Sequence, residues 1–145
     1  MLTTFCRVTD LSDRLIRCVG AVIHDDDGRL LLVQRATEPG RGRWSLPGGR
    51  VEPGESDATA LRRELIEEVG LAVRVGELAG SVRRAAPGGG TFEIFDYRCT
   101  VVDDTELLPG DDAADARWVS AADYRTLPLV DGLTDCLAAW SALPR

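Results

Sequence analysis

Residues 49–71 read GRVEPGESDATALRRELIEEVGL. Ser56 is a residue type that caps helix N-termini, Asp57 places an anion in the first turn, and Gly70 suits the left-handed residue that ends many helices. The stretch therefore predicts a helix over residues 57–69, which follows a glycine-rich loop.

The predicted helix has two different faces. Glu64, Glu67 and Glu68 stand at positions i, i+3 and i+4, so their carboxylates share one face. An adjoining apolar stripe should pack on the core and consists of Ala58, Leu61, Leu65 and Val69. Like charges at this spacing repel each other, and a divalent cation would remove the conflict. Mg²⁺ or Mn²⁺ suits such hard oxygen ligands, and Mg²⁺ completes its shell with water and phosphate oxygens. The alternative is a solvated acidic helix face.

The same stretch resembles the signature of the Nudix hydrolases, G-x5-E-x7-R-E-U-x-E-E-x-G-U, in which U is an aliphatic residue. Every fixed position of that pattern is filled here. The resemblance implies the α/β Nudix fold, a mixed β-sheet sandwiched between helices. Only residues 48–71 carry the motif, but the order of predicted elements fits nearly all of a single domain spanning residues 1–145.

The resemblance also implies a metal site. Its ligands would be the carboxylates of Glu64, Glu67 and Glu68 and a backbone carbonyl at Gly48. Glu64 is the first choice for the base that takes a proton from the attacking water. The other candidates are acids of a later loop, namely Glu106, Asp111, Asp112 and Asp115.

Several arginines are further candidates for the site. Arg63 could bridge Glu55 and one helix carboxylate and so fix their orientation, which would make both residues part of the catalytic apparatus. Contacts to substrate phosphate or ribose are predicted for Arg35, Arg50, Arg83 and Arg84.

The reaction implied is metal-dependent hydrolysis of a pyrophosphate bond in a nucleoside diphosphate linked to another group. ADP-ribose or a related nucleotide sugar is the favoured substrate. A nucleoside triphosphate pyrophosphohydrolase that cleans the nucleotide pool is the alternative. A nucleotide-binding sensor without turnover is a third reading, but it has no need of all three metal-positioning glutamates.

Composition limits the partners. The net charge is −7, and the basic residues are all arginine, since the chain contains no lysine. A surface without a basic stripe is poorly matched to long nucleic acid, so a small nucleotide is the expected partner. The sequence shows no signal peptide and no apolar span of membrane length, which predicts a cytoplasmic protein without membrane contact. Homodimer formation is left open.

The remaining elements follow from apolar alternation and turn residues. One hairpin is predicted from residues 18–24 and 30–35, and a second from residues 72–84 and 91–102. Further predictions are a short strand at Trp44, an acidic loop over 108–116, a strand over 116–120, a helix over 121–124 and an amphipathic helix over 130–142. Residues 1–14 could form an arm, an extra strand or a dimer contact.

Overall fold

The computed structural model of the chain describes residues 14–103 and 106–145. Its first sheet contains β1 (Leu15–Ile23), β4 (Gly48–Arg50), β5 (Val73–Ala85) and β6 (Thr91–Val101), in the order β4-β1-β6-β5. This sheet is mixed, because β1 runs parallel to β6 while the other pairs are antiparallel. The second sheet contains β2 (Leu30–Arg35), β3 (Trp44–Ser45) and β7 (Ala113–Val119), in the order β3-β2-β7.

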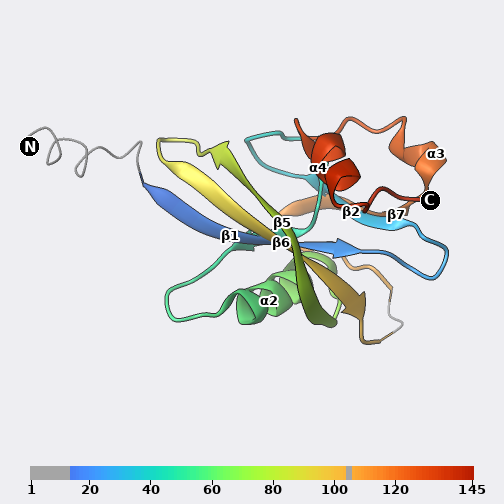
Figure 1. Cartoon of the computed structure of the whole chain (residues 1–145), viewed down its shortest axis with the longest axis horizontal. Coiled ribbons are helices and arrows are strands. Elements are labelled where there is room, and N and C mark those ends of the chain that lie inside the picture. Colours follow the sequence, from blue (N-terminus) through green and yellow to red (C-terminus); the bar gives the residue numbers. More distant parts are fainter. Residues whose placement is uncertain (1–13, 104–105) are drawn as a thin grey trace, which may run out of the picture.

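Helices cover both sides of the strands. Helix α2 (Asp57–Val69) lies on one side, and α3 (Ala121–Tyr124) and α4 (Leu133–Ala139) lie on the other (Figure 1). The predicted bounds of the motif helix are confirmed, and so are its caps. The Ser56 side chain accepts a hydrogen bond from the backbone N–H of Thr59, and Gly70 is left-handed with φ 72°.

The predicted hairpin of residues 18–35 is wrong. Strands β1 and β2 belong to different sheets, and their pairing stops after one bridge between His24 and Leu30. Both strands are largely buried on both faces, as is typical of central strands that pair on each side. Accordingly, β1 pairs with β4 and β6, while β2 pairs with β3 and β7.

The second predicted hairpin is confirmed, since β5 and β6 pair from Val73 with Val101 to Ala85 with Thr91. The short strand at Trp44 and helix α3 are also confirmed. Strand β7 begins at Ala113, inside the predicted acidic loop, because that end of the strand pairs with Arg35. Helix α4 is shorter than predicted and starts after left-handed Gly132.

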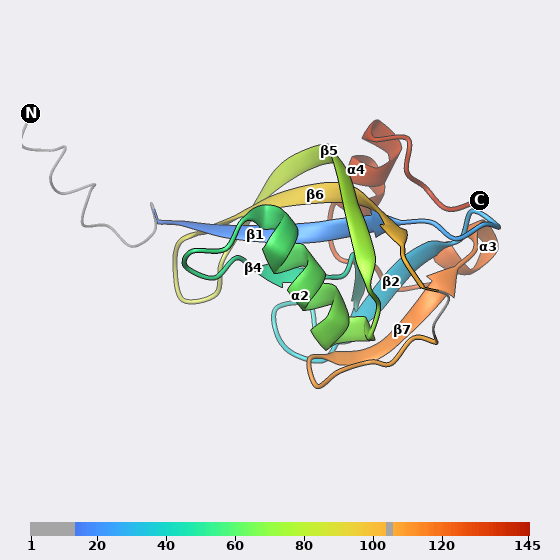
Figure 2. The ribbon, with the colours of Figure 1, turned by 90° about the horizontal axis from the view of Figure 1, so that it is seen from below.

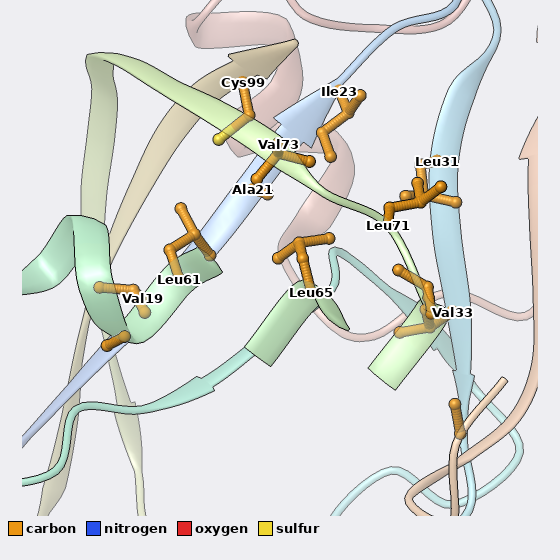
Figure 3. Packing of buried hydrophobic residues seen from close by; sticks show 13 residues of the cluster. Val19, Ala21, Ile23, Leu31, Val33, Leu61, Leu65, Leu71, Val73 and Cys99 are labelled. Carbon is orange, nitrogen blue, oxygen red and sulfur yellow. The ribbon is translucent and has the colours of Figure 1, made fainter. Parts of the chain in front are cut away.

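One core cluster lies between α2 and the two sheets. Figure 3 shows Leu61 and Leu65 of α2 among side chains of β1 and β2. Leu61, Leu65 and Val69 are buried as predicted, whereas Ala58 is only half-buried and Ala60 is buried instead. A second cluster joins the other side of β2 to α3 and α4 and includes Leu133 and Leu137. Figure 2 shows α2 lying across the four-stranded sheet.

The predicted arm, residues 1–14, falls almost wholly outside the described residues. In the part of the chain that is described, no helix is both long and apolar enough to cross a membrane.

Candidate active site

A cavity of about 840 Å³ extends over the face of the four-stranded sheet that lies opposite α2 and reaches carboxylates of α2 beside the edge strand β4. Part of its lining comes from alternate residues of strand β1. Val19, Ala21 and Ile23 of β1 point into the α2 core, so Cys18 and Gly20 face the other way and line the cavity. The cavity has the size of a small-molecule site.

Two of the motif glutamates reach this cavity. Glu64 and Glu68 are one helical turn apart on α2, and both line it. Glu67 is not among the lining residues, and its side chain is 59% exposed. The structure therefore brings Glu64 and Glu68 together, with Glu67 on the outer side of the helix.

Burial makes these two carboxylates reluctant to ionise. Loss of solvent raises the pKa of Glu68 to about 7, and the nearby Glu64 adds to this shift while the N–H of Gly48 opposes it. That N–H donates to Glu68 Oε1 over 2.9 Å. Burial also raises the pKa of Glu64, against the hydrogen bond from Arg63.

The adjoining glycine pair lets the backbone approach. A Cβ on Gly48 would collide with the carbonyl oxygen of Val19, and a Cβ on Gly49 would collide with the Glu64 carboxylate. Because glycine has no side chain, the backbone of strand β4 can lie directly beside the carboxylates of Glu64 and Glu68. Backbone groups of Gly48 and Gly49 are thus exposed to the same end of the cavity.

Arg63 organises the motif carboxylates. Its Nε and Nη2 donate to the two oxygens of Glu55, each over 2.8 Å. Its Nη1 donates to Glu64 over 2.9 Å and to Glu67 over 3.3 Å, and Nη2 also donates to the carbonyl of Arg50. The paired hydrogen bonds from Arg63 lower the pKa of Glu55 to about 2. Arg63 thus holds three carboxylates of the motif in fixed relation.

The predicted substrate arginines divide into two groups. Arg35, Arg50 and Arg84 line the cavity. Arg83 does not, because neighbouring residues of β5 point to opposite faces of the sheet. It is 65% exposed and forms an ion pair with Glu93 over 2.9 Å.

One of the four loop acids, Asp112, lies at the cavity, whereas Glu106, Asp111 and Asp115 are not among its described lining residues. The loop is held by the end of α2. The backbone N–H of Leu108 donates to Val69 and that of Gly110 donates to Glu68, each over 2.8 Å. These bonds satisfy carbonyls that the helix leaves unpaired at its end.

Asp96 is a cavity residue that the sequence analysis missed. It lies on β6, is only 5% exposed and lines the cavity floor. Burial raises its pKa to about 6, against the field of Arg84. The sequence contained one sign of this position, because Asp96 is a single carboxylate on the same strand face as the apolar residues Phe92 and Ile94.

The donor set fits Mg²⁺ or Mn²⁺. Across the described ranges, no three acidic, His or Cys side chains form a ready-made cage. Mg²⁺ does not need one, since it usually takes one or two carboxylates and keeps water and phosphate ligands. Glu64, Glu68 and the backbone of Gly48 offer oxygen donors of the right kind at one end of the cavity.

We expect the stability of the metal-free protein to fall as pH rises from 4.5 to about 7. Folded Glu68 keeps its proton to about 7, whereas an unshifted glutamate loses it near 4.5. Within this window the folded state binds more protons, so the free energy of unfolding decreases as pH increases. Glu68→Gln should therefore reduce the dependence of Tm on pH over this range, measured by thermal melts in the presence of a chelator.

The matched control is Glu77→Gln, which changes a side chain that is 82% exposed and outside the cavity lining. It should keep the wild-type slope. Asp96 titrates in an overlapping range in all three proteins, so its contribution cancels. An unchanged slope in Glu68→Gln would show that Glu68 is not the buried titrating group.

Several known proteins are similar to this chain in sequence. A CTP pyrophosphohydrolase of Escherichia coli is 43% identical over 76 residues, which cover 52% of this chain and 56% of that protein. An ADP-ribose pyrophosphatase of Methanocaldococcus jannaschii is 37% identical over 108 residues, covering 73% of this chain and 61% of that protein. The match thus spans little more than half the length of these relatives.

A solved structure has the same fold. The MutT protein from Methanosarcina mazei Go1 superimposes with a TM-score of 0.77 at 26% identity, covering 90% of this chain and 96% of that one. The sequence itself matches the NUDIX domain over residues 14–139, a range that contains every strand and helix from β1 to α4. The expected α/β Nudix fold is confirmed, and the chain belongs to the NUDIX domain family.

Proposed function

We propose that this protein hydrolyses a pyrophosphate bond in a nucleoside diphosphate linked to another group, with Mg²⁺ or Mn²⁺ as cofactor. The observation that carries the proposal is the meeting of Glu64, Glu68 and the Gly48 backbone at one end of a cavity of about 840 Å³. Burial raises the pKa of both carboxylates in the metal-free protein. A divalent cation would stabilise their charged forms, so the pair is well suited to bind one.

The metal would be held by Glu64, Glu68 and the carbonyl of Gly48, with Glu67 as a further candidate. When bound, it supplies charge neutralisation at the pyrophosphate and a lower pKa for a bound water. Arg63 keeps the carboxylate of Glu64 in position by its hydrogen bond of 2.9 Å. Glu64 remains our first candidate for the proton acceptor, and Asp112 is the loop candidate at the cavity.

Three arginines supply positive charge around the cavity. Arg35, Arg50 and Arg84 all line it, and none belongs to an ion pair in the described residues. Guanidinium groups of this kind are available for phosphate or ribose oxygens. Arg83 is committed to Glu93, so we leave it out of the proposed site.

ADP-ribose or a related nucleotide sugar is the lead substrate. A relative that matches 73% of this chain is named an ADP-ribose pyrophosphatase, which supports this choice. A nucleoside triphosphate is the second candidate, because another relative is named a CTP pyrophosphohydrolase. The two candidates share a nucleoside joined to a pyrophosphate and differ in what lies beyond it.

Product analysis over a nucleotide panel tests the proposal. With Mg²⁺ or Mn²⁺, ADP-ribose should yield AMP and ribose 5-phosphate, whereas a triphosphate should yield a nucleoside monophosphate and pyrophosphate. The ratio of the two rates decides between the candidates. Absence of turnover on both, with protein that is folded and binds nucleotide, would overturn the enzyme proposal in favour of a sensor.

A further inference from the structure

The floor of the cavity contains one carboxylate, Asp96, to which the proposed hydrolysis assigns no role. Asp96 is 5% exposed, and its carboxylate opens onto the cavity. Within the described ranges no hydrogen bond or ion pair engages it. Its oxygens keep access to the cavity, since no fully buried side-chain oxygen of the described residues lacks a partner. A ligand in the cavity that donates a hydrogen bond to this carboxylate would therefore replace the little solvent that reaches it.

The backbone around Asp96 is cleared of side chains. In the sheet register Asp96 pairs with Gly20 on β1 and with Gly80 on β5, and Gly20 pairs in turn with Gly48 on β4. A Cβ on Gly20 would collide with the Asp96 carboxylate, and a Cβ on Gly80 would collide with the indole of Trp140. The carboxylate therefore lies in a trough beside the indole.

The next row of the sheet is less polar. Cys18, Ile94 and Val82 are in register and all line the cavity. An apolar floor and an indole wall with one acceptor between them match a planar heterocycle that has an N–H donor on its edge.

The row of Gly48, Gly20 and Asp96 across the sheet indicates where such a ring would lie relative to the phosphates. Gly48 and Asp96 are two strands apart, which is about 10 Å at the usual strand spacing. A nucleotide with its phosphates beside Gly48 and the motif glutamates could thus place its base over Asp96. Arg84, which also lines the floor, is a donor available to an acceptor atom of the same ring.

We propose that Asp96 determines base specificity by accepting a hydrogen bond from the exocyclic amino group of the nucleobase. This inference rests on the proposed function for the position of the phosphates. A carboxylate only accepts hydrogen bonds, so it favours an amino group and repels a carbonyl oxygen at the same position. Adenine and cytosine should therefore be preferred over hypoxanthine and uracil, which carry an oxo group there.

The test uses two matched substrate pairs, ATP against ITP and CTP against UTP. We expect wild-type kcat/KM to favour the amino member of at least one pair by about 10- to 100-fold, as for a lost hydrogen bond to a charged group. Asp96→Asn should reduce or invert the ratio, because an amide can donate to an oxo group. Asp96→Leu should bring the ratio close to one. If diphosphate sugars are the better substrates, ADP-ribose and its inosine counterpart replace the triphosphates.

Asp26→Asn is the control, since Asp26 is exposed in the turn after β1 and lies outside the cavity lining. It should keep the wild-type ratios, and thermal melts check that each variant is folded. Unchanged ratios in both Asp96 variants would overturn the inference. A variant effect confined to ATP against 2′-deoxy-ATP would also overturn it, because Asp96 would then contact the ribose.

A binding experiment distinguishes failure of the proposed hydrolysis from failure of the proposed role of Asp96. If the wild type hydrolyses none of these nucleotides, calorimetric binding of ATP and ITP still tests Asp96. Tighter binding of ATP that is lost in Asp96→Asn would support the role of Asp96 without hydrolysis. Equal binding of ATP and ITP by the wild type would overturn that role.

Discussion

Glu68→Gln should lower turnover on the order of 100-fold or more while leaving the protein folded. The change keeps the size of the side chain but removes the charge that a divalent cation would need. Loss of groups that merely support metal ligands commonly costs about 10- to 100-fold, and loss of a ligand should cost at least as much. The measurement is kcat on the best substrate of the panel, with Mg²⁺ varied.

The fold of this variant should be unharmed. Glu68 is a carboxylate whose pKa burial raises to about 7, so a neutral amide removes a charge that the folded state tolerates poorly. The Tm of the metal-free variant should equal or exceed that of the wild type. Glu77→Gln should match the wild type in both turnover and Tm, and wild-type turnover in Glu68→Gln would remove Glu68 from the site.

Arg63→Lys should lower kcat by about 10- to 100-fold with a smaller change in KM. Arginine donates to both oxygens of Glu55 and at the same time to Glu64 and Glu67. A lysine ammonium keeps the charge but cannot reproduce this planar arrangement of donors. Glu64 would lose its fixed orientation beside the cavity.

The adjacent Arg62 offers a matched control. Arg62 is exposed, and among the described residues its side chain forms one hydrogen bond, a long one of 3.5 Å to Thr59. Arg62→Lys should leave kcat and KM unchanged. If Arg63→Lys instead raises KM and preserves kcat, Arg63 contacts substrate phosphate rather than orienting the glutamates.

The motif helix could be predicted from sequence because its determinants are local. Ser56 and Gly70 mark its ends, and both caps form as expected. The spacing of Glu64 and Glu68 also places their carboxylates on one face without knowledge of the rest of the chain. Arg63 and Glu55 are also close in sequence, because Glu55 directly precedes the N-cap Ser56 and Arg63 lies on the helix that Ser56 caps.

The pairing of strands could not be predicted in the same way. The turn at Asp25 suggests a hairpin, but β1 and β2 are both central strands. Their longest pairings are with β6 and β7, which lie far along the sequence. Asp96 was missed for the same reason. Its place on the cavity floor depends on the parallel pairing of β1 with β6, which sets Asp96 beside Gly20, where there is no side chain to cover its carboxylate.

Binding of Mn²⁺ tests the central claim most directly, because it reports on the α2 carboxylates without requiring a known substrate. The free ion can be followed by its electron paramagnetic resonance signal as protein is added at neutral pH. We expect the wild type and Glu77→Gln to bind Mn²⁺ equally, and Glu64→Gln and Glu68→Gln to bind at least about 10-fold more weakly. Wild-type affinity in both Glu64→Gln and Glu68→Gln would contradict the assignment of this cavity as the metal site.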